Sequence, residues 1–155
     1  EEVNCEQKHV IPRKVVERFG EDLTGKTFAI WGLAFKPDTD DMRQAAAITI
    51  INELTKRGAK VKAYDPKAEK EARVCYLKDN KNVEYCDSKY TVLVDADAMI
   101  LVTEWKEFRQ PDFIEIKKRL KNPVIFDGRN QFDAHSLSDK GFEYYQIGVS
   151  SKLNK

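Results

Sequence analysis

Charged residues crowd a stretch that follows a short apolar run, WGLAFKPDTDDMR at residues 31–43. Gly32 ends the run, and Lys36 and Arg43 place two cations among three aspartates. Such a loop could hold a dinucleotide, a metal ion or a phosphate, or it could simply begin a helix. The three aspartates are Asp38, Asp40 and Asp41.

The glycine pattern argues against direct dinucleotide binding here. That fingerprint needs a second glycine so that the backbone can approach the pyrophosphate, and Gly32-Leu33-Ala34 lacks one. Asp65 stands where a ribose-binding acid would, but further along the chain than the usual distance of about 20 residues. The alternative is that Asp65 is a turn residue before Pro66. No Gly-Lys-Ser/Thr follows Gly32, so the loop is not a P-loop either.

Metal and phosphate are the other ligands to weigh for this loop. Three carboxylates could bind Mg²⁺, but Thr39 or Asp40 is better explained as an N-cap, with the other acids favouring the helix start. Free N–H groups at a helix N-terminus, flanked by Lys36 and Arg43, favour an anionic ligand. The alternative is that the neighbouring aspartates are themselves the partners of Arg43.

A second candidate is FDGRN at residues 126–130. Asp127 ends a buried strand, and Arg129 follows in the turn. If the strands are parallel, Lys36 and Arg129 could approach one anionic ligand from adjacent loops. Trp105, after another apolar run, could stack on a base or simply pack in the core.

The histidines and cysteines form no catalytic or metal-binding pattern. His9 and His135 have no evident nucleophile to activate. Three cysteines, Cys5, Cys75 and Cys86, lack zinc-site spacing, and an odd number argues against a disulfide framework. A reducing cytoplasm is the expected compartment.

These candidate residues need a scaffold, and apolar runs alternate with helical patterns along the chain. The central runs are continuously apolar, which is typical of a parallel sheet covered on both faces. We therefore predict a three-layer α/β/α Rossmann-like domain with a mainly parallel sheet. Its ligand rim, the edge at the carboxyl ends of the strands, is expected to contain loops 32–41, 65–70, 103–110 and 127–133.

The expected bounds of the elements follow from the same patterns. Helices are expected within 3–19 (interrupted by Pro12) and over 41–57, 67–82, 88–95, 111–120 and 136–140. Strands are expected over 27–32, 60–66, 98–103, 123–128 and 142–147.

Composition bounds the function further. The 155 residues suit one domain, and 27 basic against 26 acidic residues give a net charge of +1, so no overall field recruits nucleic acid or an anionic membrane. We expect neither as a partner, since there is also no membrane-length apolar run and no signal peptide. The start, EEVNCEQKHV without an initiator methionine, suggests a piece of a longer protein.

Five motifs occur along the chain in this order: GKTFAIWGLAFKPDTDDMR, VKAYDPKA, ILVTEWKEFRQPDF, PVIFDGRNQFD and GFEYYQIG. Together they resemble the C-terminal, UDP-binding domain of the UDP-glucose/GDP-mannose dehydrogenase family. The similarity runs from about Val3 to Gly148 and leans toward UDP-glucose 6-dehydrogenases. It implies a linker-helix end at 1–22, a UDP-binding Rossmann-like domain at 23–150 and a tail at 151–155.

The resemblance implies an NAD-dependent oxidoreductase that converts UDP-glucose to UDP-glucuronate by two hydride transfers. The family's NAD fingerprint and catalytic cysteine are absent here, so no catalytic residue is assigned and the chain alone is expected to be inactive. The implied partners are UDP-glucose, the N-terminal and central parts of the same enzyme, and further copies in a homodimer or larger homo-oligomer. A UDP-N-acetylhexosamine or GDP-mannose dehydrogenase, or a free-standing nucleotide-binding module, are the alternatives.

The resemblance also assigns roles to individual residues. Phe35, Lys36 and Arg129 match residues that contact the UDP-sugar, and Arg43 matches an arginine that reaches NAD. No metal ligand is implied. The chain departs from the family pattern at Gln44, Ala46 and Val149, where Glu, Pro and Arg are common.

Overall fold

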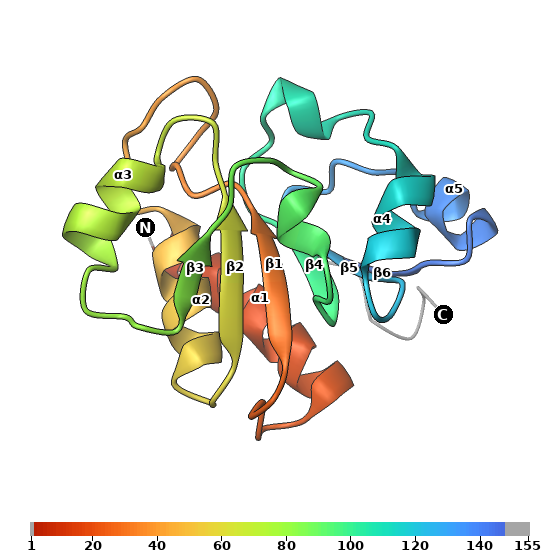
Figure 1. The fold of residues 1–155 in the computed structure, drawn as a ribbon, viewed down its shortest axis with the longest axis horizontal. Coiled ribbons are helices and arrows are strands. Elements are labelled where there is room, and N and C mark those ends of the chain that lie inside the picture. Colours follow the sequence, from red (N-terminus) through yellow and green to blue (C-terminus); the bar gives the residue numbers. More distant parts are fainter. Residues whose placement is uncertain (1, 148–155) are drawn as a thin grey trace.

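A computed structural model describes the chain over residues 2–147, with side chains from residue 8 onward; Val149 and the tail at 151–155 lie outside the described residues. Helices and strands alternate from the first strand onward (Figure 1). The strands are β1 (Thr27–Trp31), β2 (Lys60–Tyr64), β3 (Val83–Tyr85), β4 (Ala98–Leu101), β5 (Val124–Asp127) and β6 (Glu143–Gln146). The helices are α1 (Glu2–Phe19), α2 (Ala46–Thr55), α3 (Glu69–Glu71), α4 (Phe113–Arg119) and α5 (Ala134–Asp139), with a π-helical turn η1 (Ala72–Tyr76) and 3₁₀ turns η2 (Thr91–Leu93) and η3 (Lys106–Phe108).

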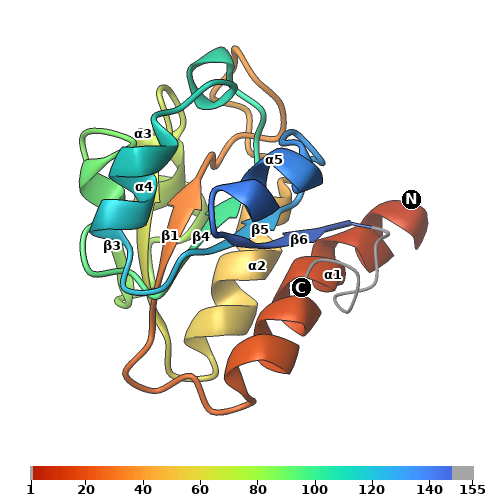
Figure 2. The ribbon, with the colours of Figure 1, turned by 90° about the vertical axis from the view of Figure 1, so that its right-hand side faces the viewer.

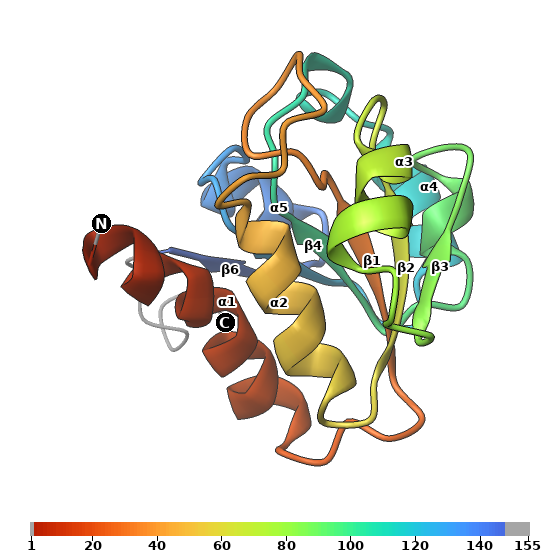
Figure 3. The same cartoon turned by 90° about the vertical axis from the view of Figure 1, so that its left-hand side faces the viewer.

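The strands form one parallel sheet in the order β3-β2-β1-β4-β5-β6. Ile30 of β1 is in register with Ala63 of β2 on one side and with Ile100 of β4 on the other. Strands β2 and β3 are added on one side of β1 and the later strands on the other, so the strand order reverses between β1 and β4. Helices α1 and α2 cover one face, and α4 lies on the other (Figures 2 and 3). The predicted three-layer α/β/α fold is therefore confirmed, and ligands of such sheets bind at the reversal point, beyond the carboxyl ends of the strands.

The core holds the central strands rigidly beneath that rim. Every residue of β4 and β5 is buried, as their continuous apolar sequences predict. Trp31 is fully buried at the end of β1 and stacks on Phe108 with ring centroids 4.7 Å apart. The loops that follow β1, β4 and β5 thus start from fixed points.

Helix α1 runs without a break through Pro12, so the predicted interruption is wrong. A proline removes one backbone hydrogen bond from a helix and crowds the preceding turn. Ile11 and Val15, on either side of it, are buried (1% and 0% exposed), and α1 packs against α2 and β5 (Figure 3). Burial of this apolar face offsets the hydrogen bond lost at Pro12. The same packing places α1 alongside the rim of the sheet.

The second helix begins at Ala46, later than the predicted start at residue 41. The N-cap is Ala45, so neither Thr39 nor Asp40 caps the helix as predicted. Thr39 instead accepts a hydrogen bond from the N–H of Asp41 (3.1 Å), inside the preceding loop. Gln44 has φ +60°, a left-handed conformation that a helix cannot include.

Smaller differences lie away from the rim. The helix expected over 88–95 is only the 3₁₀ turn η2, and the helix expected over 67–82 shortens to α3 and η1. The edge strand β3 was not predicted, because three residues give no periodic signal. Helix α4 begins at Phe113 rather than at Pro111, with Asp112 as N-cap accepting from Ile114 N (3.0 Å). Over the part of the chain that the structure covers, no helix is both long and apolar enough to span a bilayer.

Candidate functional site

A cavity of about 70 Å³ opens at the carboxyl rim where the sheet reverses its order. We call it the rim cavity. Residues of α1, the β1 loop, the start of α2 and the ends of β4 and β5 contribute to it, so segments distant in sequence meet there. Phe35, 42% exposed, lies at its edge. Its polar lining side chains are Lys8, Gln44 and Arg129.

The rim cavity favours an anion. Lys8 and Arg129 bring two cations, and no carboxylate of the described residues lines the wall. Ala46, at the first turn of α2, also lines it, and the N-cap Ala45 offers no side-chain acceptor to the free N–H groups of that turn. An uncapped helix start adds a partial positive charge. Phosphate is the common biological group that suits this arrangement.

Arg129 is held in place by a two-pronged ion pair. Its Nε donates to Glu104 Oε2 (2.7 Å) and its Nη2 donates to Glu104 Oε1 (3.0 Å). Partial burial is the largest single influence on the pKa of Glu104 and raises it, but the hydrogen bonds from Arg129 and the positive charges of Arg129 and Arg109 together outweigh burial, and the pKa lies below its ordinary value. Glu104 is therefore charged at neutral pH and fixes the guanidinium beside the cavity.

Asp127, at the end of β5, shapes the loop that presents Arg129. Its carboxylate is fully buried and accepts from the N–H groups of Arg129 (2.9 Å), Gln131 (2.7 Å) and Phe132 (2.9 Å). The hydroxyl of Tyr144 also donates to it (2.5 Å). Burial, and then the charge of Asp127, raise the pKa of Tyr144 well above its ordinary value, so this hydroxyl stays a donor.

Asp65 performs the same task at the end of β2. It is 5% exposed, and its Oδ2 accepts from Leu33 N (2.6 Å), Ala34 N (3.0 Å) and Trp105 Nε1 (3.2 Å). Its Oδ1 accepts hydrogen bonds from the backbone N–H groups of residues 67 and 68 (2.8 and 2.7 Å), the first two after Pro66, which has no N–H. Asp65 is thus a turn residue that also joins three loops, and Trp105 is a packing residue with a bonded indole.

The contacts of Asp65 also show that the loop after β1 has no room for the pyrophosphate of a dinucleotide. The N–H groups of Leu33 and Ala34, which would face a pyrophosphate, are already bonded to Asp65. Gly32 is packed so tightly that an added Cβ would lie 2.5 Å from Thr103 Cβ. Thr103 Oγ1 also donates to the carbonyl of Ala34 (2.6 Å), which closes the loop over its own backbone. The predicted lack of a direct NAD site in this loop agrees with this geometry.

The other two predicted residues, Lys36 and Arg43, are exposed and do not line the rim cavity. Arg43 lies before α2 rather than in its first turn. Its guanidinium pairs with Asp41, Nη2 to Oδ2 at 2.9 Å, while its side chain remains 82% exposed. The alternative reading, that an aspartate is the partner of Arg43, is therefore correct in the unliganded chain.

This pair makes a pH-dependent prediction. Hydrogen bonds from Arg43 lower the pKa of Asp41 from 3.8 to about 2. A folded-state pKa below the unfolded value means that the pair stabilises the loop above about pH 3.8 and that this contribution is lost as the pH falls through 2. Carboxyl-carbon NMR should give a midpoint near 2 for Asp41, and Arg43→Gln should raise it toward 3.8. An unchanged midpoint in that variant would contradict the assignment.

Three residues of the site were missed from the sequence. Lys8 lines the rim cavity, but no local pattern around it in the sequence indicates a ligand. Gln44 differs from the glutamate that is common in the family, and in the structure it has a φ of +60°. Glu104 belongs to the TEW triplet, where a carboxylate directly after a buried strand could have indicated a partner for a cation on the next loop.

Among the side chains that the structure describes, those of residues 8–147, no group of three or more histidine, cysteine, aspartate or glutamate residues could hold a metal ion. Cys75 is exposed and Cys86 buried, and both are free thiols; the side chain of Cys5 lies outside the described residues.

Known proteins resemble the chain in sequence. The sequence model of the UDP-glucose/GDP-mannose dehydrogenase family, UDP binding domain, matches residues 29–134. UDP-glucose 6-dehydrogenase of Pseudomonas aeruginosa is 39% identical over 147 residues, which are 94% of this chain and 32% of that protein. UDP-glucose 6-dehydrogenase TuaD of Bacillus subtilis is 40% identical over 147 residues, 95% of this chain and 31% of that protein. The chain thus spans about a third of the length of these relatives.

Solved structures resemble it in fold. A UDP-glucose dehydrogenase from the hyperthermophilic archaeon Pyrobaculum islandicum superposes with a TM-score of 0.77 at 27% identity, over 96% of this chain and 31% of that one. A UDP-D-ManNAc dehydrogenase from Pyrococcus horikoshii superposes with a TM-score of 0.68 at 25% identity, over 91% of this chain and 30% of that one. The structural likeness therefore extends to enzymes named for different nucleotide sugars.

Proposed function

The chain belongs to the UDP-glucose/GDP-mannose dehydrogenase family, as the UDP-binding domain of a nucleotide-sugar dehydrogenase, and from this premise we propose its substrate and its role. The parent enzyme oxidises C6 of UDP-glucose to give UDP-glucuronate, with two hydride transfers to NAD⁺. The proposed boundaries are 1–22 for the end of a linker helix, 23–150 for the UDP-binding domain and 151–155 for a tail.

The observation that supports this best is the cationic rim cavity. We assign a phosphate of the UDP-sugar to the space between Arg129 and the start of α2, where Lys8 adds a second cation. Phe35, half-exposed at the edge, packs against the nucleotide, and Lys36 reaches the outer phosphate from the same loop. Arg129 must then share its donors between Glu104 and the ligand, which its remaining N–H groups allow.

The cavity holds only part of such a ligand. Small-molecule sites enclose roughly 300–1,000 Å³, whereas the rim cavity encloses about 70 Å³, room for one phosphate-sized group. The remainder of the substrate site therefore comes from the N-terminal and central parts of the enzyme. We also propose that the working enzyme is a homodimer or larger homo-oligomer.

Arg43, exposed and pointing away from the packed core, is the residue of this chain that we assign to NAD. The cofactor's pyrophosphate has no cradle here, so its main site lies in the missing parts.

Activity assays test this division of labour. The isolated chain mixed with UDP-glucose and NAD⁺ should produce no NADH above the blank, because the described residues that line the rim cavity include no nucleophile and the β1 loop offers no dinucleotide cradle. The full-length enzyme should produce two NADH per UDP-glucose consumed. Turnover by the isolated chain would overturn the assignment.

Sugar specificity separates the proposal from its closest rival. A dehydrogenase of UDP-N-acetylhexosamines or GDP-mannose could share this domain, since the family and the similar structures include enzymes of both kinds. Comparing kcat/KM of the full-length enzyme on these nucleotide sugars decides between them, and UDP-glucose should be the best substrate. The other alternative is a free-standing nucleotide-binding module. Such a module would bind UDP tightly by itself, without any further domain.

Lys8 gives a separate prediction for UDP binding. A charge-assisted hydrogen bond contributes about 1.5–3 kcal/mol, so Lys8→Gln should weaken UDP binding about tenfold. Arg13→Gln is the matched control, since it removes one charge from the exposed side of the same helix. Isothermal titration of the full-length protein measures both. Equal effects from the two variants would mean that Lys8 acts only through net charge.

A further inference from the structure

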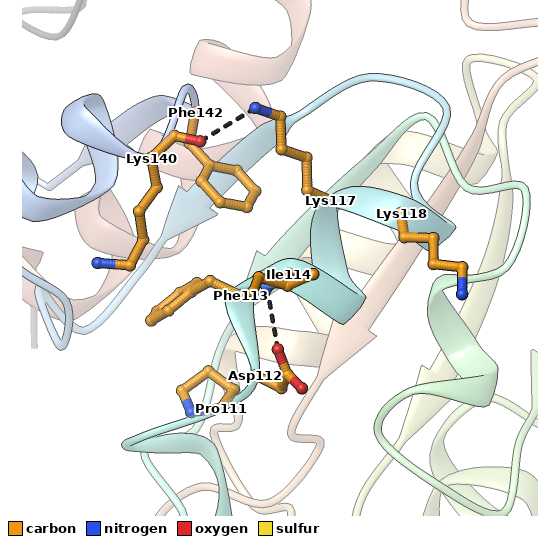
Figure 4. Close-up of a pocket in the computed structure, with 8 residues that line it drawn as sticks. All are labelled: Pro111, Asp112, Phe113, Ile114, Lys117, Lys118, Lys140 and Phe142. Carbon is orange, nitrogen blue, oxygen red and sulfur yellow. Dashed lines mark hydrogen bonds between the residues drawn. The ribbon is translucent and has the colours of Figure 1, made fainter.

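A second, larger hollow lies on the sheet face opposite to α1 and α2. It encloses about 740 Å³ between α4 and the segment that leads from α5 into β6 (Figure 4). We call it the α4 groove. Its walls are formed mainly by the apolar side chains of Phe113, Ile114 and Phe142 and by the lysines 117, 118 and 140.

One apolar side chain of the α4 groove, Ile114, is largely open to solvent. Ile114 is 80% exposed, the highest value among the large apolar residues that the structure describes. Next to it, the rings of Phe113 and Phe142 meet edge to face with centroids 5.9 Å apart. Phe142 is itself buried (5% exposed), so Ile114 is an exposed apolar side chain beside a largely buried aromatic pair. An apolar centre with a polar rim is typical of a protein-binding site.

The rim of the groove is cationic, and two of its charges have no carboxylate partner among the described residues. Lys117 Nζ donates to the carbonyl oxygen of Lys140 (3.1 Å), and Lys140 Nζ donates to Ser136 Oγ (2.9 Å). Both acceptors are neutral, so the two positive charges are held in position without being compensated. Figure 4 shows Phe142 between these two lysines.

The remaining charged groups at the groove are already engaged. Lys118 lies 4.0 Å from Glu115, and Asp112 accepts the N–H groups that begin α4. The groove therefore presents a net positive charge, which selects against basic partners and attracts acidic ones.

Two other occupants fit this surface less well. A second copy bound about a two-fold axis would place the same patch against itself, bringing lysines against lysines. The missing parts of the enzyme must complete the rim cavity, which is lined from α1 and α2 on the other face (Figure 2). The rim cavity and the α4 groove share no lining residue, so a segment that completes the rim cavity does not need to reach the groove.

We propose that the α4 groove is a docking site for an acidic segment of a separate protein. The segment inserts a bulky apolar side chain beside Ile114, Phe113 and Phe142, and places carboxylates on Lys117 and Lys140. This surface is distinct from the substrate-binding rim, so the partner and UDP bind at the same time.

The test uses a defined probe, a fluorescein-labelled peptide in which glutamate pairs alternate with leucine pairs. Fluorescence anisotropy measures its affinity for the full-length enzyme. The double variant Lys117→Glu/Lys140→Glu should lower the affinity at least about tenfold, and Ile114→Ser about fivefold. Lys60→Glu/Lys78→Glu, the matched control with the same charge change on exposed sites away from the groove, should leave it within about twofold. Melting temperatures of all variants verify that they fold.

Three outcomes would overturn the proposal. The first is no binding of the peptide, and the second is an equal loss in the control variant, which would indicate attraction by net charge alone. The third is a self-association, detected by sedimentation equilibrium, that disappears in Ile114→Ser, since the occupant would then be a second copy. UDP binding, measured in the same variants, should be unchanged, so failure here is separable from failure of the rim-cavity assignment.

Discussion

Arg129→Ala is expected to lower kcat/KM for UDP-glucose in the full-length enzyme by at least about 100-fold. The variant removes a charge-assisted contact to phosphate, which is worth about 1.5–3 kcal/mol. It also leaves the Glu104 carboxylate, now without its two hydrogen bonds, facing a phosphate of the same sign. The two effects act in the same direction, and steady-state kinetics on UDP-glucose measures their sum.

Two further variants make this result specific. Arg73→Ala, which breaks a longer, exposed ion pair with Glu69 (3.7 Å) outside the lining of the rim cavity, should leave kcat/KM unchanged. Arg129→Ala combined with Glu104→Gln should recover part of the loss, because the repelling carboxylate is gone while the missing contact is not. If Arg129→Ala alone had less than a threefold effect, the phosphate would lie elsewhere.

Asp65→Ala should cause the largest loss of stability of any single substitution in the rim loops. Five N–H donors, four of them from the backbone and one from the indole of Trp105, lose their acceptor together. Each buried donor left without a partner costs about 1–3 kcal/mol, and partial entry of water reduces the sum to roughly 3–5 kcal/mol. For a domain of this size the melting temperature should fall by about 10 °C.

Calorimetry of the isolated chain measures this loss, with Asp41→Ala as the control because Asp41 is an acid of the exposed part of the rim. Asp41→Ala should shift the melting temperature by only a degree or two, as expected for a surface ion pair. Asp65→Asn should lie between the two, since the amide keeps one acceptor oxygen but turns a donor toward the remaining N–H groups. A melting temperature of Asp65→Ala within about 2 °C of the parent chain would contradict the role assigned to Asp65.

Much of the scaffold could be predicted because it depends on local patterns. The continuous apolar runs of β4 and β5 indicate burial on both faces, and burial on both faces implies a parallel sheet with helices on either side. The turn role of Asp65 follows from its position before Pro66. The start of α2 could not be predicted, because Thr39 and Asp40 have good N-cap chemistry and only the left-handed backbone of Gln44 ends the loop where it does.

The candidate site could be predicted only in part, because some of its residues are brought there by long-range packing rather than by a local pattern. Arg129 and Phe35 lie in the loops that follow buried strands, so sheet geometry brings both to the rim cavity. Lys8 comes from a helix that precedes the sheet, and its approach to the cavity depends on how α1 packs against α2 and β5. Long-range packing of this kind leaves no periodic signal, and neither does the choice of Glu104 as the partner of Arg129.

The most direct test of the account is a backbone-amide NMR titration of this chain with UDP and, separately, with NAD⁺. Half a site should bind weakly, near the millimolar range that corresponds to about 4 kcal/mol, and NMR detects such binding. We predict that UDP shifts the amides around Phe35, Ala46 and Arg129, whereas NAD⁺ leaves the amides of Leu33 and Ala34 unchanged. Shifts of Leu33 and Ala34 with NAD⁺, and none at Arg129 with UDP, would contradict the account and make this sheet the dinucleotide site.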